Sequence, residues 1–343
     1  MNFAGVRNIA GSSVLNGGIQ PGIDSIFNHT MPKAIKTAED MPGGSVARYM
    51  EITARQLGLN PKTSSGLLTS ARMTNAALET ICFRGLEVRV VITAGIDING
   101  VRIGDPSSYY EQEGQFICPS GTINILLTIN ANLPPGTLLK SVITATEAKT
   151  AALQELLAPS KYSFGLATGS GTDGIIVAAD PASPHTLTDA GGHSLLGELI
   201  GRVVTAGVKK ALELETGLSP QRQMNVLERV KRFGINIDYF LQRAAADYPS
   251  LATGDEFRTG LLKLFSQPQL VALASAVIHL QDQVYWRLLP ENTAFCAAQC
   301  ILQTSDMPRI TSTEPGEVPA RALINLLVDW LNNTAYRELK HPL

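Results

Sequence analysis

The nine residues LATGSGTDG, at positions 166–174, combine three glycines with small hydroxyl side chains and one carboxylate, Asp173. Glycine tolerates positive φ angles and lets backbone N–H groups approach a ligand closely, as in anion-binding loops. A phosphate-binding Walker loop would carry Lys followed by Ser or Thr after its last glycine, whereas this turn carries Asp173, which repels phosphate. The turn is therefore predicted to hold hydroxyls, amides or a water molecule, unless a cation intervenes.

The segment ahead of this turn, LLKSVITATEAKTAALQELL at 138–157, is predicted to form a helix that carries two charges suited to proton chemistry. On a helical wheel its apolar side chains form one stripe with threonines in the middle, comprising Leu139, Val142, Ile143, Thr146, Thr150, Leu153 and Leu157. Glu147 and Lys149 fall on opposite margins of this stripe. The threonines either belong to a site or bond back to the carbonyl of residue i−4. Glu147 and Lys149 are either site residues or solvated surface charges.

His193 lies in DAGGHSLLGELIG, where paired glycines precede a predicted helix and Ser194 can serve as the N-cap. A histidine at this place can act as an acid, a base or a ligand, or it can be a hydrogen-bonded turn residue. The five histidines of the chain lack His-x-x-x-His spacing and no Cys-x-x-Cys pair occurs, so the sequence predicts no metal site.

Near the N-terminus, GSSVLNGG offers the hydroxyls of Ser12 and Ser13, followed by the turn-forming residues Asn16, Gly17 and Gly18. A serine nucleophile needs a base and an oxyanion hole. The surrounding sequence supplies no base, and the chain has no Gly-x-Ser-x-Gly elbow, so the pattern favours a plain β-turn.

The elements around these residues predict an α/β (α+β) fold with a mixed sheet covered by helices. Runs rich in β-branched residues indicate strands at 85–96, 122–130, 162–167 and 175–179. The helix between the second and third of these runs permits a parallel crossover. Asn99 and Gly100 stand between apolar runs and predict a hairpin, so antiparallel pairing is expected as well.

The pattern changes near residue 217, which predicts two domains, 1–216 and 217–343. Beyond this point the apolar spacing is helical throughout, with predicted helices at 219–247, 256–265, 267–289, 294–302 and 320–339.

Composition excludes several functions for the chain of 343 residues. Its formal charge of −2 provides no basic excess for a nucleic-acid partner. The start has no secretory pattern, and the longest apolar run, Leu270–Leu280, falls short of the ~20 residues that span a membrane. The sequence therefore predicts a cytoplasmic protein without membrane or nucleic-acid partners.

Seven segments in order resemble the adenosylcobinamide amidohydrolases, corrinoid-salvage enzymes of archaea and some bacteria: GSSVLNGG, GLLTSA, VITAGIDINGVRIGD, GTINILLTIN, ATEAKTAAL, LATGSGTDGIIVAA and GGHSLLGELIG. The resemblance spans about residues 5–215. It implies hydrolysis of the amide that joins aminopropanol to the f-propionyl side chain of adenosylcobinamide, which yields adenosylcobyric acid. The implied partner is a small corrinoid, with cobalt carried by the substrate and no cofactor in the protein.

Amide hydrolysis needs a base that activates water, donors for the oxyanion and an acid for the departing amine. With this resemblance, Glu147 and Asp173 become candidate bases, and Lys149 or His193 the candidate acid or oxyanion donor. Asparagine suits a corrin rim studded with amides because its side chain both donates and accepts. The expected substrate-binding residues are polar or glycine and comprise Ser13, Asn16, Gly17, Asn99, Asn124, Thr146, Thr168, Gly169, Ser170 and Thr172.

Two other functions stay open at this point. The chain could be a corrinoid-binding module without hydrolytic activity, or a nucleotide-using transferase, against which the missing Walker lysine argues. The helical last third lies outside the seven segments. It could form a lid over the corrin site, a surface for homo-oligomer formation, or a module for a separate partner.

Overall fold

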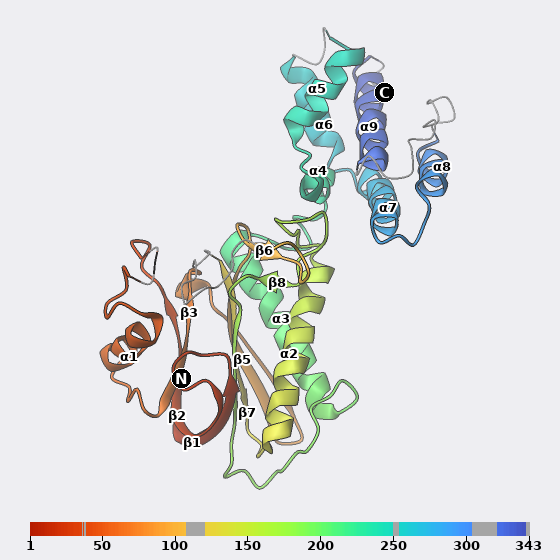
Figure 1. Cartoon of the computed structure of the whole chain (residues 1–343). Coiled ribbons are helices and arrows are strands. Elements are labelled where there is room, and N and C mark those ends of the chain that lie inside the picture. Colours follow the sequence, from red (N-terminus) through yellow and green to blue (C-terminus); the bar gives the residue numbers. More distant parts are fainter. Residues whose placement is uncertain (36, 38, 108–120, 250–253, 304–320, 341–343) are drawn as a thin grey trace. The chain divides into compact units, whose positions relative to one another are not determined.

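The computed structural model describes residues 1–35, 37, 39–107, 121–249, 254–303 and 321–340. Contacts between residues divide the chain into two compact units, Met1–Ser219 and Pro220–Leu343. The described strands all belong to the first unit, whereas the second is helical (Figure 1). The sequence pattern predicts a domain boundary between residues 216 and 217.

The first unit is built on a seven-stranded mixed sheet with the strand order β3-β2-β1-β9-β7-β5-β4. Its strands are β1 (Asn2–Gly11), β2 (Gly18–Thr30), β3 (Ser64–Thr69), β4 (Ala77–Phe83), β5 (Leu86–Gly95), β7 (Thr122–Ile129) and β9 (Gly174–Ala179). The pairs β2–β3 and β7–β9 are parallel, and the other neighbours are antiparallel. The predicted mixed sheet is therefore confirmed, with β7 and β9 as its parallel crossover pair.

Strand β7 is buried on both faces, which explains the almost continuous apolar run in TINILLTIN. Ile123, Ile125 and Leu127 belong to the core cluster shared with the helices α2 (Pro135–Glu155) and α3 (Leu195–Thr216). Leu126 points to the opposite face, where it packs in a second cluster with residues of β2 and β3. The sheet therefore lies between two apolar layers.

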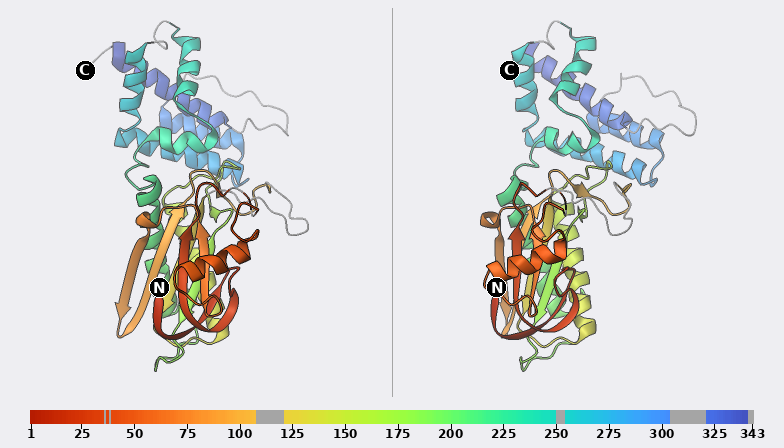
Figure 2. Two further views of the ribbon diagram at one scale, coloured as in Figure 1. Left: turned by 90° about the vertical axis from the view of Figure 1, so that its left-hand side faces the viewer. Right: turned by 60° about the vertical axis from the view of Figure 1, so that its left-hand side comes forward.

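Helices α2 and α3 cover one face of the sheet, and α1 (Val46–Gln56) lies on the other side (Figures 1 and 2). Helix α2 begins with a proline in its first turn, where the missing N–H costs no hydrogen bond. Helix α3 begins as predicted at Ser194, whose Oγ accepts a hydrogen bond from the backbone of Gly197 at 3.0 Å. It ends at Gly217, whose φ of 71° is the left-handed conformation that suits glycine.

The second unit packs helices around α9 (Ala322–Lys340), which contacts α5 (Ile237–Asp247), α6 (Asp255–Leu264), α7 (Pro268–Tyr285) and α8 (Glu291–Leu302). Among the described residues, four fully buried phenylalanines form part of its interior: Phe233, Phe240, Phe257 and Phe265. Helix α4 (Val226–Val230) precedes these helices in the chain. One predicted helix, 219–247, is interrupted because Gly234 adopts a left-handed conformation with φ of 72°.

Within the described ranges, no single helix is long and apolar enough to cross a membrane. Helices α6 and α7 meet the length and composition criteria only as a pair, with a bend of 78° between them.

Two predictions about strands in the first unit are wrong. Residues 162–167 form no strand, because the surrounding chain closes into a loop in which Ala167 N–H donates to the Ala158 carbonyl at 2.8 Å. The predicted hairpin at Asn99 and Gly100 is also absent from the described residues. Gly100 lies in β6 (Gly100–Val101), which pairs with β8 (Gly169–Ser170), while β5 turns back to β4 through Arg84 and Gly85, both with positive φ.

Candidate functional site

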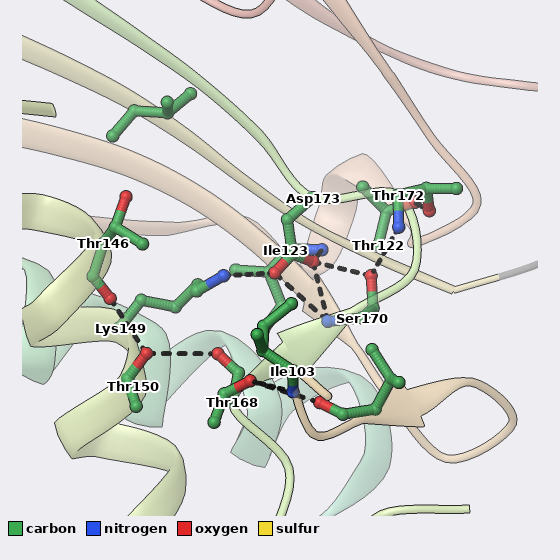
Figure 3. Close-up of polar contacts among 12 residues, drawn as sticks. Ile103, Thr122, Ile123, Thr146, Lys149, Thr150, Thr168, Ser170, Thr172 and Asp173 are labelled. Carbon is green, nitrogen blue, oxygen red and sulfur yellow. Dashed lines mark hydrogen bonds and ion pairs between the residues drawn. The ribbon is translucent and has the colours of Figure 1, made fainter. Parts of the chain in front are cut away.

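An ion pair between Lys149 of α2 and Asp173, directly before β9, lies at the amino ends of the parallel strands β7 and β9 (Figure 3). The two side chains are largely buried, with 11% and 16% of their surfaces exposed. Lys149 is therefore placed inside the fold and is no solvated surface charge.

The carboxylate of Asp173 is surrounded by donors from two further residues. The backbone N–H of Ile123 donates to Oδ1 at 3.0 Å, and the hydroxyl of Ser170 donates to the same oxygen at 2.6 Å. The backbone N–H of Ser170 reaches both oxygens, at 3.0 and 3.1 Å. A carboxylate has about four acceptor sites, so these groups and Lys149 occupy its capacity. The donors of Ser170, predicted to grip substrate, are instead taken up by Asp173.

Gly121 links this ion pair to neighbouring elements. Its carbonyl accepts hydrogen bonds from the side chains of Asn99 at 2.6 Å and of Thr122 and Thr172, both at 2.7 Å. Its N–H donates to the Ser70 hydroxyl at 2.7 Å. The φ of Gly121 is +107°, and a Cβ would lie 2.1 Å from Asn99 Oδ1, so only glycine fits this junction.

Two adjoining cavities open beside Gly121. The smaller, of about 230 Å³, has a mixed lining of apolar and polar side chains that includes Ser12, Ser13, Met31, Met41, Met50, Ser70, Thr122, Asn124, Thr172 and Asp173. The larger, of about 380 Å³, is lined by residues that include Met31, Met41, Ser70, Gly95, Asp97, Gly121 and Glu215. The three residues common to both linings join the cavities. Apolar walls with a few polar groups are typical of small-molecule sites.

Asn124 lines the smaller cavity and carries a buried acceptor that is unpaired among the described residues. Its Nδ2 donates to Asn28 Oδ1 at 2.8 Å and to the Leu68 carbonyl at 2.7 Å, which fixes the orientation of the amide. Its Oδ1 is fully buried and has no hydrogen-bond partner among the described residues. A buried acceptor without a donor costs about 1–3 kcal/mol. The atom is therefore suited to receive an N–H or O–H from a ligand.

Glu215 occupies the last turn of α3 and lines the larger cavity, with 16% of its side chain exposed. Its Oε2 accepts hydrogen bonds from Asn75 Nδ2 at 2.6 Å and from the backbone N–H and Nε of Arg72 at 3.3 and 3.4 Å. These described bonds fix the carboxylate through one of its oxygens.

Glu215 is not among the residues predicted from the sequence, and neither are Ser70, Gly121 and Thr122. A pattern could have indicated Glu215, because it continues the buried stripe of α3 that runs through Val204, Val208 and Ala211.

Other predicted residues lie away from the ion pair. Glu147 and Thr146 are exposed on α2, and Thr146 Oγ1 bonds back to the Val142 carbonyl at 2.8 Å. His193 is exposed in a loop beside the first half of α2, where Thr144 Oγ1 donates to the carbonyl of Ala190 at 2.7 Å. Within the described residues, no hydrogen bond links His193 to Lys149 or Asp173.

The predicted apolar stripe of α2 has the wrong phase. Leu139 and Ile143 are 50% and 48% exposed. The helix instead buries a face of mostly small side chains, including Leu138, Ser141, Thr144, Ala145, Ala148, Lys149, Ala152 and Leu153. This phase turns Lys149 inward, while the threonines at positions 146 and 150 make back-bonds to residue i−4.

The remaining predicted residues shape the backbone around the cavities. Ser13 Oγ donates to the Gly66 carbonyl at 2.6 Å, and Asn16 Nδ2 donates to the carbonyls of Pro61 and Ser64. A Cβ at Gly17 would lie 1.9 Å from the Ser13 carbonyl oxygen, so this turn requires glycine.

Thr168 and Asp105 make hydrogen bonds in the loops next to β6 and β8. Thr168 Oγ1 accepts from the backbone of Ile103 at 2.9 Å (Figure 3). Burial acts to raise the pKa of Asp105, but hydrogen bonds from Ser160, Ser163 and Arg102 outweigh it and hold the pKa below its ordinary value. Thr168 and Gly169 therefore belong to the hydrogen-bonded segment around β6 and β8, which lies beside the ion pair.

No cluster of three or more His, Cys, Asp or Glu side chains in the described part of the chain could hold a metal ion.

Comparison with known proteins gives consistent matches. The profile of the adenosylcobinamide amidohydrolase family matches residues 1–220. An uncharacterised protein of Methanocaldococcus jannaschii is 35% identical over 176 residues, which cover 48% of this chain and 68% of that protein. A protein of Methanosarcina mazei named adenosylcobinamide amidohydrolase is 30% identical over 211 residues, which cover 59% of this chain and 89% of that protein. The resemblance found in the sequence is confirmed, and the chain belongs to the adenosylcobinamide amidohydrolase family.

Proposed function

We propose that this protein hydrolyses the amide between aminopropanol and the corrinoid in adenosylcobinamide, releasing aminopropanol and adenosylcobyric acid. The observation that carries this proposal is the family match over residues 1–220, which includes the whole first unit and both of its cavities. The corrinoid is the partner, its cobalt belongs to the substrate, and the protein's own side chains carry out the hydrolysis.

The size and lining of the cavities support this substrate. At about 230 and 380 Å³ they suit the amide side chain of a corrinoid, while the macrocycle stays outside. Methionine side chains adapt to irregular apolar shapes, so Met31 and Met41 can pack along the corrin rim. The unpaired Oδ1 of Asn124 can accept the N–H of the amide or the hydroxyl of aminopropanol.

The ion pair and the hydroxyls around it have separate roles in this proposal. Asp173 holds the turn that carries Ser170 and Thr172 against β7, and Lys149 balances its charge. Thr122 and Thr172 lie in the cavity lining and contact the substrate. Glu147 and His193 take no part in the reaction, because both are exposed and neither lines these cavities.

The test is to incubate the purified full chain with adenosylcobinamide, without ATP or added metal, and to separate the products by chromatography and mass spectrometry. We expect free aminopropanol and adenosylcobyric acid in equal amounts. A corrinoid that is bound but intact would contradict the proposal and favour the binding module. Turnover that requires ATP and magnesium would favour the transferase.

A further inference from the structure

We propose that Glu215 is the general base that activates the hydrolytic water. This inference rests on the proposed function and assigns its central proton transfer to a residue outside the sequence-predicted site. Three observations carry it: the fixed position of the carboxylate, its place in the cavity lining, and the saturation of Asp173.

The position of Glu215 is fixed by donors on one side only. Asn75 and Arg72 bind Oε2, whereas Oε1 has no hydrogen-bond donor among the described residues. Since Glu215 lines the larger cavity, Oε1 is available to a water molecule there. A carboxylate that is anchored through one oxygen and open at the other can take a proton without leaving its place.

Asp173 is poorly suited to the same task. Lys149, Ile123 and Ser170 occupy its acceptor sites, so taking a proton would require it to release one of these donors. Asp97, the second carboxylate in the lining of the larger cavity, is exposed to solvent, whereas Glu215 is largely shielded. Shielding strengthens the interaction of a carboxylate with a bound water.

The position of the scissile amide follows from the junction of the cavities. Ser70 lines both of them and accepts the N–H of Gly121, whose carbonyl binds Thr122 and Thr172. A substrate side chain that enters through the larger cavity and extends to Asn124 in the smaller one passes this junction. The carbonyl carbon of the scissile amide then lies between the hydroxyls of Thr122 and Thr172 and the larger cavity, which is lined by Glu215.

The reaction balances with this single carboxylate. Glu215 Oε1 takes one proton from water as the water oxygen bonds to the amide carbon, giving a tetrahedral intermediate. The protonated Glu215 then gives that proton to the nitrogen as the C–N bond breaks. Aminopropanol leaves as an amine and takes the acidic proton of the new carboxyl group, so the products are an ammonium ion and a carboxylate.

The decisive variant is Glu215→Gln in the full chain, with Glu213→Gln as its matched control. Glu213 lies on the same helix turn but is exposed and pairs with Lys210. We expect Glu215→Gln to lower kcat by ~10²–10⁴-fold. Binding of adenosylcobinamide, followed by equilibrium dialysis, should be unchanged because glutamine keeps the acceptor for Asn75. Glu213→Gln should retain the wild-type rate.

A second variant separates catalysis from structural support. Glu215→Ala should be equally slow, and added formate should restore part of its rate by acting as the missing carboxylate, whereas a structural defect would not respond. The proposal is overturned if Glu215→Gln stays within a few-fold of wild type, if formate has no effect, or if both variants fail to fold. If the wild-type chain itself releases no aminopropanol, the proposed hydrolase function is wrong. A failure of the Glu215 proposal alone would instead leave the wild-type chain active.

Discussion

Gly169 shows how closely the side chains of the site are packed around the ion pair. A Cβ at this position would lie 2.3 Å from Asp173 Oδ2 and 2.7 Å from Lys149 Nζ. The absence of a side chain therefore lets the backbone of β8 pass the ion pair. The pair in turn holds the turn before β9 against Ile123 of β7, so a charge on a helix orders the amino ends of two interior strands.

Lys149→Met tests this ordering. Methionine keeps much of the apolar stem but removes the charge, so Asp173 is left largely buried without its cation. We expect the free energy of unfolding to fall by about 3 kcal/mol and the rate of adenosylcobinamide hydrolysis to fall with it. Urea titration and the product assay measure the two effects.

The matched control is Glu147→Gln, two residues away on the exposed face of the same helix. It should change stability by no more than about 0.5 kcal/mol and leave turnover unchanged. Equal effects of the two substitutions would show that the ion pair has no special role.

The sequence indicated which residues could belong to the site, but it did not indicate which of them contact one another. Lys149 and Asp173 were both candidates, yet nothing in their spacing showed that they pair, because this depends on the phase of α2 against the sheet. Glu147 and His193 have suitable chemistry but are exposed. Glu215 was overlooked because it stands apart from the glycine-rich turn in the sequence and approaches the cavity only through the packing of α3.

At the scale of elements, strongly patterned segments were predictable and loops were not. Strands β5 and β7 and helices α2 and α3 match apolar runs and capping residues in the sequence. The phase of α2 could not be read from its large apolar side chains, because the buried face consists mainly of alanine, serine and threonine. Small residues let α2 approach α3 and the sheet closely. A helical wheel cannot show this, because it contains no information on the elements against which the helix packs.

Two glycines of α3 provide a matched test of such close packing. A Cβ at Gly197 would lie 2.0 Å from the carbonyl oxygen of Gly191, a backbone atom, whereas a Cβ at Gly201 meets nothing within 4 Å. We expect Gly197→Ala to destabilise the first unit by about 3 kcal/mol, since the loop before the helix must move. Gly201→Ala should stabilise it by about 0.5–1 kcal/mol, because alanine favours the helix.

Urea unfolding of both glycine variants, monitored by circular dichroism, measures these changes. A stabilising effect of Gly197→Ala would contradict the close approach of Gly191 to the first turn of α3.

At the scale of the whole molecule, the family match and the structural division coincide closely. The match covers residues 1–220, and the first compact unit ends at Ser219. The second unit has its own buried phenylalanines and its own central helix, α9. In the sequence, alternating strand and helix patterns give way to helical spacing alone, which predicts a boundary after residue 216. The sequence could not indicate what the helical unit does, since its apolar residues serve its own interior.

Separation of the two units tests whether hydrolysis depends on the helical unit. A fragment of residues 1–219 retains both cavities, Lys149, Asp173 and Glu215, so we expect it to fold and to hydrolyse adenosylcobinamide with the kcat/KM of the full chain. The complementary fragment 220–343 should be helical by circular dichroism and inactive. Because each unit has its own core, the full chain should unfold in two transitions and fragment 1–219 in one. A folded fragment 1–219 that binds the corrinoid but turns it over at least about tenfold more slowly, ~1.4 kcal/mol in activation free energy, would contradict this independence and make the helical unit part of the catalytic site.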